Sequence, residues 1–124
     1  MGTCVRMIVE YQDAAGEWRP AGIRFEAKNY TLAKHLAGVR LDEGDTVTPI
    51  ALPRGAPEGY EVDELGDLRV GPTWLGWHDH SWLLLSEVLV VDWSGIDPDF
   101  VVLLDYAEGL GAPEKTRLVF GFDS

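Results

Sequence analysis

Both ends of the chain show the alternation of apolar and polar residues that is typical of β-strands. Residues 5–11 place four apolar side chains on one face of an extended segment, namely Val5, Met7, Val9 and Tyr11. Residues 116–122 place three on one face, namely Leu118, Phe120 and Phe122. A strand needs a neighbour to satisfy its backbone groups, so we expect the last strand of the chain to lie beside the first.

A β-hairpin and three helices are predicted around and between these segments. Residues 12–16 have the composition of a turn and residues 17–25 return as a strand, so the first two strands should pair antiparallel. Pro20 predicts that this second strand lies at an edge or carries a bulge. The expected helices span residues 30–38, 82–90 and 98–107, with N-caps at Asn29, Ser81 and Asp97.

The middle of the chain, residues 41–73, shows no sustained period because prolines and glycines interrupt it. Two pieces of it, residues 47–52 and 67–70, could form short strands. A length of 124 residues is too short for two well-buried domains, so residues 1–124 are expected to form one. The element order predicts an α+β fold with a small antiparallel or mixed sheet of three to four strands, about three helices packed on one face, and a long irregular middle loop.

Acidic residues dominate the charge of the chain and concentrate in its middle. The formal net charge is −11, and residues 42–67 hold eight acids against one base, Arg54. This charge argues against nucleic acid or an anionic membrane as a ligand. The acidic stretch, which includes Glu61, Asp63 and Glu64, is either a solvated loop or a docking surface for a protein with a basic surface.

Several compositional features point to a cytoplasmic protein. No apolar run approaches the ~20 residues of a membrane-spanning helix, and the first residues lack the basic-then-apolar pattern of a secretory signal. The single cysteine, Cys4, excludes an internal disulfide and a multi-cysteine zinc site, and its place in a strand predicts an inert buried thiol. The sequence also lacks a P-loop and a nucleophile elbow.

The segment 74–82 holds two histidines that could carry chemistry. In an extended segment, His78 and His80 are two residues apart and are expected to point the same way. Together they could hold a divalent transition metal if a third ligand came from elsewhere, but no spacing nominates that ligand. A structural role for His80 just before the cap of the predicted helix, and acid–base work without a metal, are the alternatives.

Tryptophans are unusually frequent and crowd the same segment. The chain has five, and three of them, Trp74, Trp77 and Trp82, lie close together in the sequence. Aromatic anchors are enriched in interface cores, and Trp77 is the best candidate for an exposed one, whereas Trp82 is expected in the core. A further interpretation is that Trp77, His78 and Arg54 hold a nucleotide-like molecule by stacking and charge.

Five segments form a combination that extends over nearly the whole chain: Asn29-Tyr30-Thr31-Leu32, Leu36-Ala37-Gly38-Val39-Arg40, Pro53-Arg54-Gly55-Ala56-Pro57, His78-Asp79-His80-Ser81-Trp82-Leu83 and Arg117-Leu118-Val119-Phe120-Gly121-Phe122-Asp123. In this combination the chain resembles a group of small uncharacterised proteins of bacteriophages and bacterial prophages. The resemblance implies a phage or prophage context and expression in the bacterial cytoplasm. Where that group carries Cys-Asp-Ile-His near its start, this chain has Thr3-Cys4-Val5-Arg6, which lowers the expectation of an enzyme.

These observations favour a small acidic binding protein that acts by protein–protein interaction, such as an inhibitor of a host defence system, without a cofactor. Its partner would be a host or bacterial protein with a basic surface. The expected binding residues are Arg54, Glu61, Asp63, Glu64, Trp74, Trp77, His78 and His80. The alternative is a metal-dependent hydrolase or a nucleotide-binding protein, in which His78 and His80 would bind a divalent transition metal.

Overall fold

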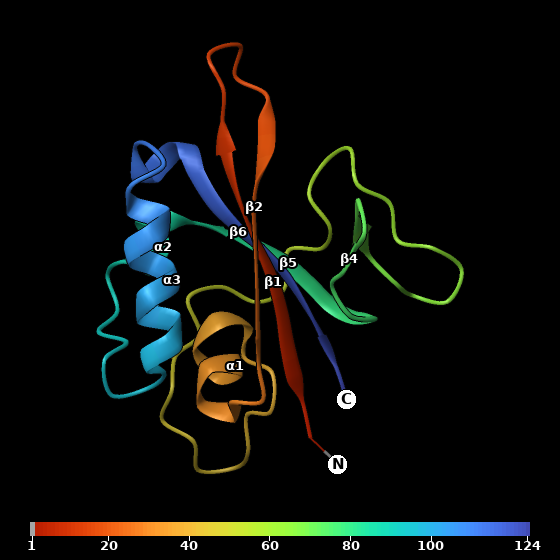
Figure 1. The fold of residues 1–124 in the computed structure, drawn as a ribbon. Helices are drawn as coiled ribbons and strands as arrows, with labels where there is room; N and C mark the ends of the chain where they lie inside the picture. Colours follow the sequence, from red (N-terminus) through yellow and green to blue (C-terminus); the bar gives the residue numbers. More distant parts are fainter. Residues whose placement is uncertain (1) are drawn as a thin grey trace.

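The structure is a computed structural model that describes residues 2–124 (Figure 1). Its strands are β1 (Cys4–Gln12), β2 (Trp18–Ala27), β3 (Arg69–Val70), β4 (Thr73–Trp74), β5 (His78–Leu84) and β6 (Thr116–Asp123). Its helices are α1 (Tyr30–Ala37), α2 (Leu85–Val88), α3 (Pro98–Glu108) and the short 3₁₀ helix η1 (Pro113–Lys115). A four-stranded antiparallel sheet, a two-stranded sheet and three α-helices confirm the α+β class.

The main sheet has the strand order β2-β1-β6-β5, so the two ends of the chain pair at its centre. Met7 of β1 lies opposite Phe25 of β2 on one side and Phe120 of β6 on the other. This pairing confirms that the last strand lies beside the first. The register between β1 and β2 shifts next to Pro20, as the proline predicted.

The helices cover one face of this sheet, as expected (Figure 1). Their caps agree with the sequence: Asn29 accepts a hydrogen bond from the backbone N–H of Leu32 at 3.1 Å, and Asp97 accepts one from Phe100 at 3.0 Å. The main core lies between the helices and the sheet. Its largest buried residues include Met7, Leu32, Leu36, Phe100, Phe120 and Phe122.

A second, smaller core covers the opposite face of the sheet. Polar residues such as Arg6 alternate with the apolar ones along β1, and such alternation is typical of a sheet with one solvated face. Instead, the buried side chains of Ile8 and Val119 on the sheet pack with Leu68 and Leu75 from the irregular segment. The middle loop is therefore part of the fold and closes the second face.

The helix predicted at residues 82–90 is present only in part, because residues 82–84 belong to a strand and the helix ends at Val88. Strand β5 continues to Leu84, and only the four residues of α2 are helical. Ser81 caps no helix, and its Oγ accepts the backbone N–H of Arg54 at 2.9 Å. Residues 82 and 83 are both apolar because they pack on opposite faces of a sheet that is covered on both sides. Periodicity cannot distinguish such a strand from a buried helix.

The middle loop also protects the outer edge of β5. The backbone N–H of Ile50 donates to the carbonyl of His35 at 2.8 Å, which ties the loop to α1. The N–H of Gly55 then donates to the carbonyl of His80 at 2.8 Å, on the strand itself. Residues 47–52 form no strand, whereas the strand predicted at 67–70 is present in part as β3. Covering an edge strand in this way blocks pairing with other chains.

Candidate functional site

The two histidine rings lie on opposite faces of the sheet, so the expectation that they point the same way is wrong. His78 is opposite Phe122 in the register and stacks on its ring, with centroids 6.0 Å apart, on the side of the helices. The ring of His80 lies against Gly121, the next residue of β6, whose side faces the smaller core. In this arrangement the two imidazoles cannot coordinate the same metal ion.

A one-residue bulge separates the two rings. In the pairing of β5 with β6, His78 lies opposite Phe122 but Ser81 lies opposite Phe120, so one residue of β5 is extra. Asp79 occupies the bulge with a φ of 50°, a left-handed conformation that a residue other than glycine rarely adopts. An extra residue reverses the side on which every later side chain emerges.

His80 makes a structural contact. Its ring is buried, and Nε2 lies 3.0 Å from the carbonyl oxygen of Gly76, which can only accept, so Nε2 carries the hydrogen. Within residues 2–124, no group of three or more His, Cys, Asp or Glu side chains comes together to hold a metal ion. Cys4 is buried too, and burial raises the pKa of its thiol.

His78 joins an acid and a hydroxyl at the surface. Its Nδ1 lies 2.7 Å from Oδ2 of Asp79, and its Nε2 lies 2.9 Å from Oγ of Ser124. If Nδ1 of the neutral ring donates to the carboxylate, Nε2 can accept from the hydroxyl of Ser124, whose Oγ also lies 3.0 Å from Oγ1 of Thr3. This chain of groups can move a proton without a metal. Ser124 could not be predicted as a partner of His78 from the sequence, because the contact depends on the pairing of β5 with β6.

Trp77 is exposed, as the sequence indicated, and lies beside an acidic turn. The side chains of Trp77 and Leu65 are 47% and 81% exposed. Gly66, the residue after Leu65, packs on the backbone of Trp77, because a β-carbon at Gly66 would lie 2.9 Å from the carbonyl oxygen of Trp77. We call this surface the Trp77 face. It consists of Glu61, Val62, Asp63, Glu64, Leu65, Trp77 and Asp79, all of which are exposed.

The acidic turn has a fixed shape. Oδ1 of Asp63 accepts the backbone N–H groups of Leu65 and Asp67, both at 2.9 Å. These bonds form a side-chain-stabilised turn, whose tip directs Leu65 into solvent. Asp63 is therefore partly structural, whereas Glu61 and Glu64 have exposed side chains free to meet a partner.

Arg54 and Trp74 are not part of the Trp77 face. The guanidinium of Arg54 donates to both carboxylate oxygens of Glu87, at 2.8 and 2.6 Å, and lies 4.7 Å from the centre of the Trp82 ring. Its hydrogen bonds hold the pKa of the Glu87 carboxyl below the usual range. Trp74 is half-buried and donates to Asp67 at 3.0 Å. The structure therefore does not assemble the nucleotide-binding group of Trp77, His78 and Arg54.

A buried ionic network lies on the face of the sheet away from the helices, where sequence reasoning missed it. Glu10 is fully buried and accepts from Nε of Arg117 at 2.8 Å, and the hydroxyl of Tyr60 donates to its other oxygen. The guanidinium carbon of Arg117 also lies 4.1 Å from the centre of the Trp18 ring. The only available signal was the alternation that places Glu10 beside Ile8, and it suggested a solvated residue.

Tyr60 makes the stability of this network depend on pH. Desolvation, followed by the hydrogen bond to Glu10, raises the pKa of Tyr60 from 10.0 to about 12. The folded state therefore keeps this proton when the unfolded chain loses it, and stability should fall as the pH rises from about 10 to about 12. Urea unfolding across this range should show that the Tyr60→Phe variant loses less stability than the parent chain. Tyr106→Phe, at an exposed position on α3, should leave the loss unchanged.

Comparisons with known proteins add no relative. The chain matches no family model, no curated protein and no solved structure. Within residues 2–124, none of the helices combines the length and hydropathy that crossing a bilayer requires.

Proposed function

We propose that this chain is a small acidic binding protein of the phage or prophage type, acting by protein–protein interaction in the bacterial cytoplasm. Its partner would be a host protein with a basic surface, and inhibition of a host defence system is the outcome we propose. The observation that carries the proposal is the Trp77 face, which combines an exposed indole, an exposed leucine and exposed acidic residues.

The chemistry of this face suits a partner of defined character. Trp77 and Leu65 expose apolar area, and its removal from water by a partner would favour binding. Tryptophan is among the residues that most often dominate the binding energy of an interface. The acidic residues of this face, including Glu61 and Glu64, would attract a basic surface and speed its association. The net charge of −11 adds to this attraction at long range.

The alternative function, a metal-dependent hydrolase or nucleotide-binding protein, receives less support. His78 and His80 lie on opposite faces of the sheet, and Arg54 is engaged by Glu87. The hydrogen-bonded chain through His78 supports proton transfer, but the groups that contact it include no second imidazole. We therefore place recognition ahead of catalysis.

Replacing Trp77 by alanine should weaken partner binding by at least about 30-fold, as expected for an interface residue worth ~2 kcal/mol. The measurement is the affinity of the purified chain for its stoichiometric partner from a bacterial host lysate, captured at low salt and then purified. Glu61→Gln with Glu64→Gln should mainly slow association and reduce its dependence on salt.

Val90→Ala is the matched control, because Val90 is 81% exposed but lies outside the Trp77 face. It should retain the parental affinity. If Trp77→Ala and Val90→Ala bind alike, or if no stoichiometric partner is captured at low salt, the proposed function is wrong.

A further inference from the structure

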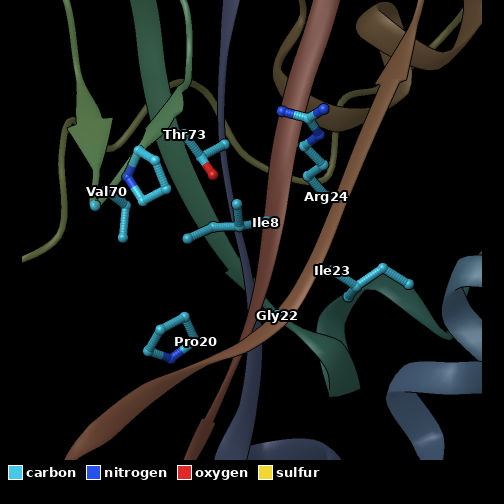
Figure 2. Close-up of a pocket in the computed structure, with 9 residues that line it drawn as sticks. Ile8, Pro20, Gly22, Ile23, Arg24, Val70 and Thr73 are labelled. Carbon is cyan, nitrogen blue, oxygen red and sulfur yellow. The ribbon is translucent and has the colours of Figure 1, made fainter.

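A separate apolar pocket of about 350 Å³ lies on the face of the main sheet away from the helices (Figure 2). Its walls are mainly apolar and come from the sheet and from the β3–β4 turn. The apolar side chains lining it are Ile8, Pro20, Val70 and Pro72; Ile23 also borders the pocket, but its side chain packs against the main core on the other face of the sheet. None of these residues belongs to the Trp77 face, so the pocket requires its own explanation.

A bulge in β2 opens this pocket. In the pairing with β1, Ile8 lies opposite Arg24 and Glu10 lies opposite Pro20, so three residues of β2 span one residue of β1. Gly22, in the middle of the bulge, has a φ of 77°, which favours glycine. Such a bulge bends the strand away from its neighbour. The space that it leaves is bounded across the sheet by the β3–β4 turn.

One charged side chain lines this apolar space. Arg24 is exposed and lies opposite Ile8 in the register. Figure 2 shows its guanidinium at the same end of the pocket as the hydroxyl of Thr73. Among the described residues, Arg24 takes part in no ion pair, although six other basic residues do: Arg6, Arg19, Lys34, Arg54, Arg69 and Arg117.

An arginine without a carboxylate partner is notable in this chain, because acids outnumber bases by 21 to 10. No acidic residue lines the pocket. A cationic ligand would meet the guanidinium, and a wholly polar ligand would lose water without gaining partners from the apolar walls. The lining is therefore complementary to a molecule with an apolar body and one negative end.

We propose that this pocket binds a small carboxylate with a compact apolar body. The carboxylate would accept hydrogen bonds from Arg24 and Thr73, and the body would cover Ile8, Val70 and Pro72. A guanidinium offers the paired donors that suit a carboxylate. The volume lies near the lower end of the range for small-ligand sites, about 300–1,000 Å³, which suits a ligand of the size of octanoate.

The test uses the whole chain and two probes of equal length, octanoate and 1-octanol, the former kept below its micelle concentration. Amide shifts in ¹H–¹⁵N NMR spectra report both affinity and location. Octanoate should shift the amides of Ile8, Ile23, Arg24 and Val70, and it should bind more tightly than 1-octanol. Arg24→Gln should weaken octanoate binding by about tenfold, the loss of one charge-assisted hydrogen bond, and leave 1-octanol binding unchanged.

Arg19→Gln is the matched control. Arg19 lies on the same strand and the substitution changes the net charge by the same amount, but the residue does not line the pocket. It should bind octanoate like the parent chain. Absence of shifts at the pocket amides, equal binding of the two probes, or equal effects of Arg24→Gln and Arg19→Gln would each overturn the proposal. The spectra of both variants also report whether they fold.

Discussion

Replacing Glu10 by alanine is expected to destabilise the protein by about 3–5 kcal/mol, because the substitution leaves the buried guanidinium of Arg117 without its carboxylate. Glu10 is fully buried and Arg117 is only 7% exposed, so water cannot easily replace the lost partner. Tyr60 would lose its hydrogen-bond acceptor at the same time. Urea unfolding at neutral pH measures the effect.

The double variant Glu10→Leu with Arg117→Met removes both charges of the ion pair but keeps apolar side chains at both positions. Removing both charges should cost much less than Glu10→Ala alone, since replacing a buried ion pair by apolar residues is often neutral or stabilising. The account of this network would be contradicted if Glu10→Ala cost less than about 1 kcal/mol, the level of an exposed ion pair.

The second large effect is expected at Gly76, where replacement by alanine should cost more than about 4 kcal/mol or prevent folding. An added β-carbon would lie 2.3 Å from the carbonyl oxygen of Phe122, and neither atom can move away without a shift of the backbone that holds it. The same contact region includes the hydrogen bond from the N–H of Trp77 to that oxygen, at 2.9 Å. Urea unfolding, or the yield of folded protein, provides the measurement.

Gly59→Ala is the control for backbone conformation. Gly59 has a φ of 91° and Gly76 one of 79°, but a β-carbon at Gly59 would meet nothing within 4 Å. Gly59→Ala should therefore cost only the ~1–2 kcal/mol of the left-handed conformation. Equal losses for the two variants would show that close packing against β6 is not what requires Gly76.

Local signals were enough to predict much of the fold. The β1–β2 hairpin, α1 and α3 each have alternation, caps or turn residues within a short window, and all were predicted at nearly their observed positions. The pairing of β1 with β6 could be predicted because apolar and polar residues alternate in both segments. The strand β5 was not recognised because Trp82 and Leu83 pack on different faces, so no polar side remained to mark a strand.

The candidate site was only partly predictable for a related reason. The exposure of Trp77 follows from its neighbours, Gly76 and His78, and could be anticipated. The opposite orientations of His78 and His80 depend on the bulge at Asp79. An aspartate does not favour a positive φ strongly enough for the sequence to predict this bulge. The Glu10 network depends on Arg117, which is 107 residues away in the sequence.

The most direct test of the central claim, that recognition occurs at the Trp77 face, is site-specific photo-crosslinking in a bacterial host. A photoreactive phenylalanine at Leu65 should give one defined crosslinked protein, because this side chain is 81% exposed at the tip of the acidic turn. The same group at Val90, which is equally exposed elsewhere, should give none. A crosslink from position 90 without one from position 65, or none from either, would contradict the account.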